Sequence, residues 1–173
     1  MVRKVNTYGG GRNTNINGLK FEQTTSLDEA LVKSGYYVQG YEIHDNIGLI
    51  GLSTPKYKLY TVFLKKMNID YRDFNSKQWL PDECFINLRN QTAYIIEKKF
   101  QNTSGSVDEK LPGCHFKKNE YMKLFRPLGF KVEYLYVFNE WFSQGQYRDT
   151  LEYIHKMGCN YFFNGIPLAF LGL

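Results

Sequence analysis

Two acidic residues, Asp82 and Glu97, are spaced so that a tight hairpin would bring their side chains together. The segments 82–87 and 92–100 both look like strands, and a four-residue turn between them places Asp82 directly across from Glu97. Two ionised carboxylates at that distance repel each other unless a cation or a proton lies between them. The spacing therefore predicts a site for a hard cation such as Mg²⁺, which prefers oxygen ligands.

A lysine next to this pair adds a second chemical function. Lys99 shares a strand face with Glu97, because side chains alternate along a strand, whereas Lys98 points to the opposite face. An ammonium group beside a metal-bound carboxylate can orient a water molecule or stabilise the charge that develops on a phosphate under attack. The alternative is that Glu97, Lys98 and Lys99 are ordinary solvated charges at the end of a surface hairpin.

The pattern of apolar residues predicts the elements that would hold these side chains. The expected order is a helix at 18–34, a strand at 36–39, a hairpin at 82–100, a helix at 116–126, a strand at 130–138, a helix at 146–158 and a strand at 159–164. Ser26 and Glu29 form a capping pair, so the first helix could instead begin at Leu27. Residues 40–56 are expected to be irregular or a hairpin, and 57–67 fit either a helix or a strand. This order predicts an α/β (α+β) fold with a mixed central sheet flanked by helices.

Composition limits the class of protein. With 173 residues, 43% of them hydrophobic, the chain is expected to form one packed domain at 18–173, preceded by a flexible Gly- and Asn-rich arm at 1–17. No apolar run is long enough to span a membrane and no signal peptide is visible, so a cytoplasmic location is expected. The net charge of +5 suits a polyanionic partner without identifying one.

The cysteines and histidines exclude other chemistries. Cys84, Cys114 and Cys159 are odd in number and widely spaced, which fits neither a disulfide framework nor a zinc site, so we expect reduced, buried thiols. A Cys–His hydrolase built on Cys114 and His115 is disfavoured, because adjacent residues on one strand point apart.

Pro81-Asp82, fourteen residues, and then Glu97-Lys98-Lys99 resembles the signature of the PD-(D/E)XK nuclease superfamily, which includes most type II restriction endonucleases. The resemblance implies an α-β-β-β-α-β core, onto which the predicted order can be laid if about 42–77 is an insertion. It also implies that Asp82, Glu97 and the backbone carbonyl of Lys98 bind Mg²⁺, with Mn²⁺ as a substitute, and that Lys99 is the catalytic lysine.

Further positions are similar to elements of the same family. Glu22, in the stretch GLKFE, corresponds to an acidic residue that many members use in catalysis and metal binding. Lys117 and Tyr121 form a K-x-x-x-Y pair similar to the Q-x-x-x-Y element that some members place beside the site. Solvated helix positions are the alternative for Glu22 and for Lys117.

The resemblance implies double-stranded DNA as the substrate and Mg²⁺-dependent hydrolysis of its phosphodiester bonds. We expect DNA contacts from Lys117, Tyr121 and the loop after the catalytic strand. The candidate loop residues are Gln101, Asn102, Ser104 and Ser106, and a solvated loop without DNA contacts is the alternative for them. A type II restriction endonuclease would act as a homodimer, and a companion DNA methyltransferase could be encoded nearby. A Holliday-junction resolvase, a repair nuclease and a non-catalytic DNA-binding relative remain alternatives.

Overall fold

The central sheet is organised around one hairpin, formed by β4 (Glu83–Asn87) and β5 (Thr92–Lys99). These strands pair antiparallel with Glu83 opposite Ile96, which confirms the predicted register. Asp82, the residue before β4, continues this register toward Glu97. The hairpin therefore brings the end of β5 next to the start of β4, where the charged residues are concentrated.

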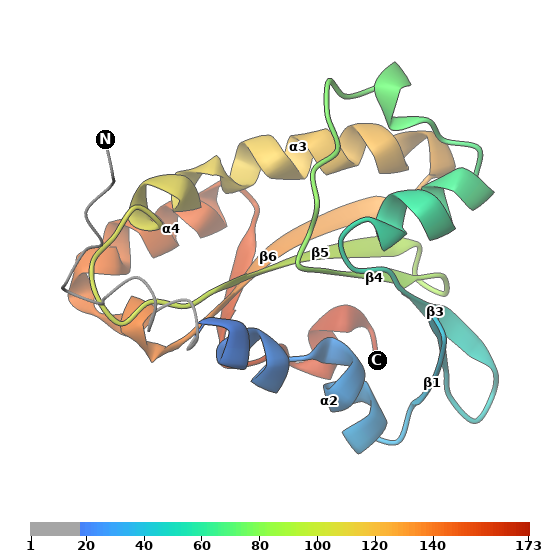
Figure 1. The fold of residues 1–173 in the computed structure, drawn as a ribbon, viewed down its shortest axis with the longest axis horizontal. Helices are drawn as coiled ribbons and strands as arrows, with labels where there is room; N and C mark the ends of the chain where they lie inside the picture. The colour runs from blue at the N-terminus through green and yellow to red at the C-terminus, as the bar shows by residue number, and fades with distance from the viewer. Residues whose placement is uncertain (1–17) are drawn as a thin grey trace, which may run out of the picture.

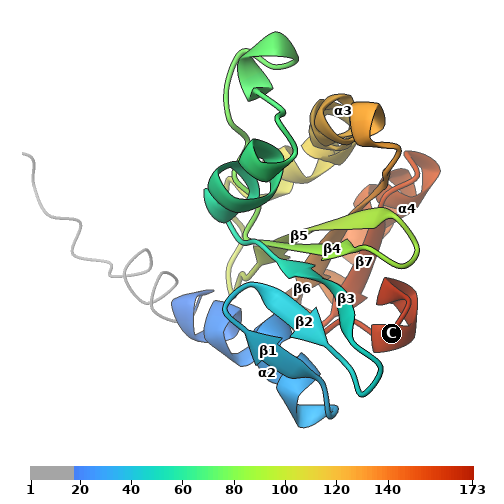
Figure 2. The same cartoon turned by 90° about the vertical axis from the view of Figure 1, so that its right-hand side faces the viewer.

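The computed structural model describes residues 18–173 and contains a seven-stranded sheet whose strands lie in sequence order. The other strands are β1 (Tyr37–Gln39), β2 (Glu42–His44), β3 (Leu49–Ser53), β6 (Lys131–Phe138) and β7 (Asn160–Phe163). Strands β1 to β5 pair antiparallel, whereas β5, β6 and β7 are parallel (Figure 2). This mixed sheet with flanking helices confirms the predicted fold class. The arm predicted at 1–17 lies outside the described residues.

Helices cover both faces of the sheet (Figure 1). One face carries α3 (Cys114–Phe125), α4 (Arg148–Lys156) and the π-helix η1 (Leu59–Leu64). The other face carries a helix at 18–24, α2 (Leu27–Lys33) and the C-terminal 3₁₀ helix η7 (Leu168–Leu171). Ser26 Oγ accepts a hydrogen bond from the N–H of Glu29 at the start of α2, so the alternative start at Leu27 is correct. The remaining 3₁₀ segments are η2 (Tyr71–Asp73), η3 (Asp108–Gly113), η4 (Arg126–Leu128), η5 (Glu140–Ser143) and η6 (Gly145–Tyr147).

Strand β5 is buried on both faces, and this explains its continuous run of apolar residues. Ala93 and Ile95 pack into the hydrophobic cluster beneath α3, whereas Tyr94 and Ile96 pack into the cluster beneath α2. The same alternation continues into the charged end of the strand. Glu97 therefore lies on the α3 side of the sheet and Lys98 on the α2 side.

The predicted insertion at 42–77 needs correction. Strand β3, inside that range, pairs with β4 and is a full member of the central sheet, with Ser53 opposite Phe85. Strands β1 and β2 form an additional hairpin at the sheet edge, and the true excursion is the segment 54–82 between β3 and β4. Residues 57–67 proved to be helical, with η1 at their centre. Glycines at 48 and 51 obscured the strand pattern of β3 in the sequence.

One of these glycines is required for β3 to approach β4. A Cβ atom added to Gly51 would overlap the backbone oxygen of Ile86, and backbone cannot move aside as a side chain can. We therefore expect Gly51→Ala to lower the free energy of unfolding by about 3 kcal/mol, the upper end for overpacking. Urea denaturation measures this change. Gly145→Ala is the control, because nothing lies within 4 Å of its added Cβ; equal stabilities of the two variants would contradict the prediction.

The buried thiols agree with expectation, and the C-terminal tail is anchored to the sheet. All three cysteines are free and buried. Leu171 is buried in η7, and its backbone carbonyl accepts a hydrogen bond from Asn87 Nδ2 at 3.0 Å.

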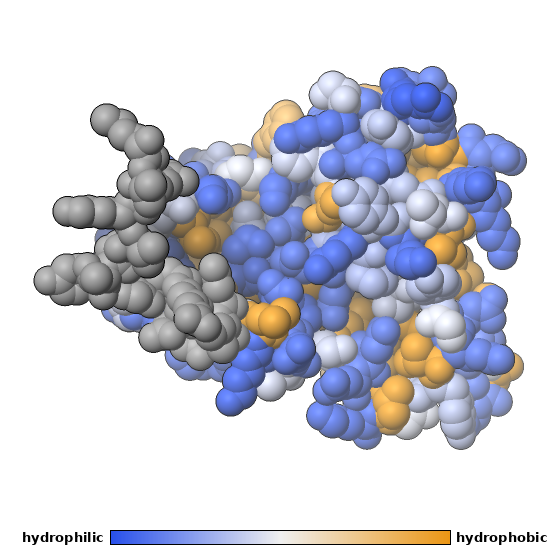
Figure 3. All heavy atoms as spheres, in the orientation of Figure 1, coloured by the Kyte–Doolittle hydropathy of each residue, from blue (hydrophilic) through white to orange (hydrophobic). Residues whose placement is uncertain are grey.

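Among residues 18–173, no helix is long and apolar enough to cross a membrane. On the face drawn in Figure 3, hydrophobic residues are scattered among hydrophilic ones.

Candidate active site

Asp82 and Glu97 meet at the open end of the β4–β5 hairpin. Asp82 Oδ2 accepts a hydrogen bond from the backbone N–H of Lys98 at 2.7 Å, so its carboxylate continues the strand pairing with a side chain. Glu97 is only 5% exposed and faces the α3 side of the sheet. Both carboxylates contact the same ammonium group, that of Lys99. The register predicted from the sequence therefore brings the two acids within reach of one cation.

The ammonium of Lys99 is surrounded by three oxygen atoms. Its Nζ lies 2.8 Å from Glu97 Oε2, 3.0 Å from the backbone oxygen of Lys98 and 3.5 Å from Asp82 Oδ2. These are the three groups that the family resemblance assigns to a metal ion. A positive charge thus already occupies the position where they converge, and hard oxygen donors are the ligands that Mg²⁺ prefers. The donor set fits a divalent cation.

The metal site would depend on main-chain and solvent ligands as well as on side chains. Within residues 18–173, no group of three or more His, Cys, Asp or Glu side chains is arranged to hold a metal ion. Two carboxylates and one carbonyl leave coordination positions open. Mg²⁺ commonly keeps several water molecules and binds through one or two carboxylates, so this sparse donor set is compatible with it.

Lys99 keeps its positive charge in this environment. Burial disfavours the charged form, but the carboxylates of Glu97 and Asp82 outweigh that effect and raise the pKa of Lys99 above its ordinary value. A lysine that stays protonated can donate hydrogen bonds and stabilise negative charge.

Lys117 supplies a second cation from helix α3. Its Nζ lies 3.2 Å from Glu97 Oε1, so each oxygen of this nearly buried carboxylate faces one lysine. The cluster contains two carboxylates and two ammonium groups, and its charges balance in the absence of a metal ion. The sequence argument placed Lys117 beside the site, and the structure brings it into direct contact with a predicted ligand.

The predicted DNA contact by Tyr121, the partner of Lys117 in the K-x-x-x-Y pair, needs correction. Its side chain is fully buried, and its hydroxyl donates a hydrogen bond to the backbone oxygen of Trp79 at 2.9 Å. Burial also raises the pKa of Tyr121, so the phenol remains neutral. Tyr121 connects α3 to the segment before β4 through this hydrogen bond, and its buried side chain is not accessible to DNA.

On the opposite face, Lys98 ties the N-terminal helices to the hairpin. Its ammonium lies 2.9 Å from Glu83 Oε1 and 3.0 Å from the backbone oxygen of Glu22. Glu83 Oε1 also accepts a hydrogen bond from the N–H of Leu27 at 3.1 Å. Burial raises the pKa of Glu83, and the charge of Lys98 opposes that rise. A buried lysine needs such partners, and sequence reasoning missed Glu83, although it directly follows Asp82.

Glu22 lies at the mouth of the site without a side-chain bond to the predicted ligands. It is half-buried in the helix at 18–24 and lines a hollow of about 410 Å³ together with Asp82 and Lys98. It also lines a second hollow, of about 310 Å³, that includes Lys99. The helix is thus in the predicted place, and a role for the Glu22 carboxylate in metal binding remains a prediction.

The loop after β5 divides into a buried anchor and an exposed part. Gln101 is only 3% exposed, and it exchanges hydrogen bonds between its backbone and the side chain of Asn139. Its side-chain oxygen accepts a bond from the hydroxyl of Tyr147. The predicted DNA contact by Gln101 therefore needs correction, because this residue anchors the loop to Asn139 and Tyr147. The other predicted loop contacts, Asn102, Ser104 and Ser106, are exposed.

Comparison with known proteins identifies the family of this domain. The family model described as a PD-(D/E)XK nuclease superfamily domain matches residues 22–125, which is more than half of the chain. The match spans the whole cluster from Glu22 through Lys117. No curated protein and no solved structure matches the chain.

Proposed function

Because the chain belongs to the PD-(D/E)XK nuclease superfamily, we propose that it is a Mg²⁺-dependent endonuclease that hydrolyses phosphodiester bonds of double-stranded DNA. Nucleases of this superfamily generally use divalent metal ions, and a nuclease domain implies DNA as substrate. The observation that supports the proposal best is the convergence of three oxygens on the Lys99 ammonium. A type II restriction enzyme is our preferred assignment within this class.

In this proposal Asp82, Glu97 and the carbonyl of Lys98 hold the metal ion. When bound, a divalent ion polarises a phosphate oxygen and lowers the pKa of a coordinated water molecule. With the ion bound, Lys99 would donate a hydrogen bond to the attacking water or to the phosphate, where negative charge accumulates. Lys117 keeps Glu97 oriented through its other oxygen. Glu22 acts as an accessory acidic group at the mouth of the site.

The proposal includes partners that follow from the restriction assignment. A homodimer would cut both strands of a palindrome, and a companion methyltransferase encoded nearby would protect the host DNA. We propose a cytoplasmic location and Mn²⁺ as a functional substitute for Mg²⁺. Asn102, Ser104 and Ser106 would contact the DNA backbone from the exposed loop.

Incubation of the purified protein with plasmid and phage DNA tests the proposal. We expect cleavage with Mg²⁺ or Mn²⁺ and none in EDTA, because the two carboxylates cannot polarise a phosphate without the ion. Discrete fragments would support the restriction assignment. Cleavage confined to four-way junctions or damaged sites would replace it with a resolvase or a repair nuclease. Absence of metal-dependent cleavage on all of these substrates would overturn the proposed activity.

A further inference from the structure

A hollow of about 550 Å³ opens beside the catalytic cluster on the α3 side of the sheet. Its lining includes three aromatic residues, three lysines and one carboxylate, namely Trp79, Phe116, Tyr136, Lys99, Lys110, Lys117 and Glu109. This volume lies within the range of small-molecule binding sites. Lys99 and Lys117 also contact Glu97, so the hollow is continuous with the proposed active site.

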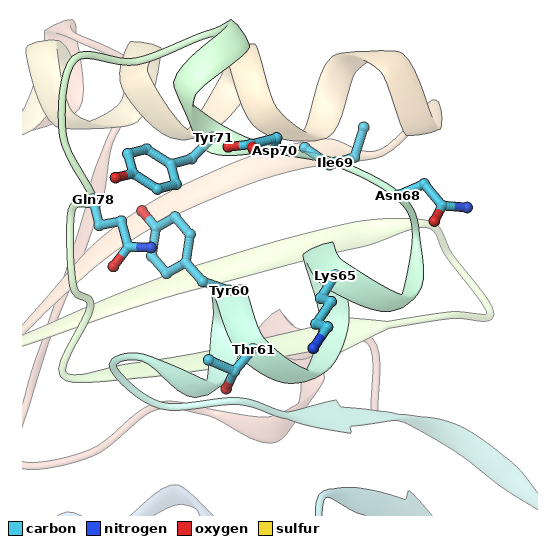
Figure 4. Close-up of a pocket in the computed structure, with 8 residues that line it drawn as sticks. All are labelled: Tyr60, Thr61, Lys65, Asn68, Ile69, Asp70, Tyr71 and Gln78. Atoms are coloured by element: carbon cyan, nitrogen blue, oxygen red, sulfur yellow. The ribbon is translucent and has the colours of Figure 1, made fainter.

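One wall of the hollow is held in a fixed position. The backbone oxygen of Trp79 accepts hydrogen bonds from the hydroxyls of Tyr60 and Tyr121, at 2.8 and 2.9 Å. Its indole N–H points to a carboxylate oxygen of Glu120 at 3.3 Å. Figure 4 shows Tyr60 beside Tyr71 and Gln78, which line a separate hollow. Trp79 is thus held by several hydrogen bonds as well as by packing.

The second wall is an aromatic ring that remains exposed. Phe116, near the start of α3, is 55% exposed although it packs edge-on against Trp79, with ring centroids 5.5 Å apart. The ammonium of Lys77 lies 3.8 Å from the centroid of the Trp79 ring. Aromatic surface bordered by lysines matches the chemistry of a nucleotide, whose base stacks on rings while its phosphate attracts cations.

We propose that this hollow binds an unstacked base of the DNA strand that carries the scissile phosphate. The inference rests on the proposed function, because it takes Lys99 and Lys117 to mark the position of that phosphate. A base inside a regular duplex cannot enter such a hollow without leaving its stack, and that step is easiest for an unpaired base. The protein therefore prefers DNA that has an unpaired base next to the cleavage point.

Equilibrium binding without divalent metal separates this inference from catalysis. Fluorescence anisotropy in EDTA would compare a labelled duplex carrying one bulged base with the fully paired duplex of the same sequence. We expect the unaltered protein to bind the bulged duplex about 5-fold more tightly or better, the lower end of base–aromatic stacking effects. Phe116→Ala should remove this preference and leave binding to the paired duplex nearly unchanged.

Two further variants provide the controls. Phe116→Tyr keeps the ring and should retain the preference, whereas Met122→Ala removes an exposed apolar side chain from the same helix and should have no effect. Equal affinity of the unaltered protein for both duplexes, or an unchanged preference in Phe116→Ala, would overturn the inference. Metal-dependent cleavage is measured separately on the same duplexes. Cleavage without the preference rejects only the base site, and the preference without cleavage rejects only the proposed activity.

Discussion

Replacing Lys99 with methionine is expected to reduce Mg²⁺-dependent cleavage about 100-fold or more while metal binding is retained or becomes tighter. Loss of one preorganised donor to the transition state typically costs 10²–10³ in rate, which is roughly the effect expected here. The affinity for the metal ion should not fall with the cleavage rate, because the Lys99 ammonium contacts all three oxygens that would bind the ion. Removing a competing cation frees these oxygens.

Isothermal titration with Mn²⁺ and single-turnover cleavage together check this prediction. Lys33→Met is a matched control, because the Lys33 side chain is 78% exposed on α2 and forms only a long ion pair with Glu29. We expect the control to match the unaltered protein in both measurements. Cleavage at the normal rate by Lys99→Met would remove Lys99 from the mechanism. A clear loss of Mn²⁺ affinity would show that the ammonium does not compete with the ion.

The hairpin and its acidic pair could be predicted because both depend on local rules. A four-residue turn sets which residues face each other, and alternation along β5 decides which side of the sheet each charge points to. These rules placed Asp82, Glu97 and Lys99 around one point without knowledge of the rest of the chain. Their chemical roles remain predictions.

The contacts that could not be predicted from the sequence are long-range. Lys98 is separated from Glu22 by 76 positions, and the bond between them depends on how the N-terminal helix docks against the sheet. Gln101 and Tyr121 looked available to DNA because periodicity does not reveal which loop or helix face another segment covers. Strand β3 was predicted to be irregular because it contains Gly51. Glycine is common in turns, but here it allows two strands to approach each other closely.

Asp82→Asn and Glu97→Gln are expected to reduce metal-dependent cleavage to a similar degree but to differ in their effect on stability. Each substitution removes one negative charge from the metal site. Two unit charges 4 Å apart interact by about 4 kcal/mol at an effective dielectric of 20, and a divalent ion interacts about twice as strongly, so we expect metal affinity to fall about a thousandfold or more. Cleavage should fall about as far. Mn²⁺ titration and cleavage assays measure the two losses.

The stabilities without metal should separate the two residues. Asparagine at 82 can still accept the bond from the N–H of Lys98, and Lys99 keeps Glu97 as a partner, so Asp82→Asn should unfold nearly like the unaltered protein. Glu97→Gln leaves the ammonium groups of Lys99 and Lys117 facing a neutral group in a site where their side chains are 22% and 27% exposed. We expect a cost of about 2 kcal/mol, below the value for fully buried pairs because water reaches both lysines.

Urea denaturation in EDTA distinguishes these outcomes, with Asp149→Asn as a control at a carboxylate whose side chain is 86% exposed. If Asp82→Asn bound Mn²⁺ as tightly as the unaltered protein, Asp82 would not be a metal ligand and the proposed activity would lose its main support. If Glu97→Gln were as stable as Asp82→Asn, the two lysines would have to find other partners when Glu97 is neutral. The cluster would then be held together by the fold around it, and its charge balance would contribute little to stability.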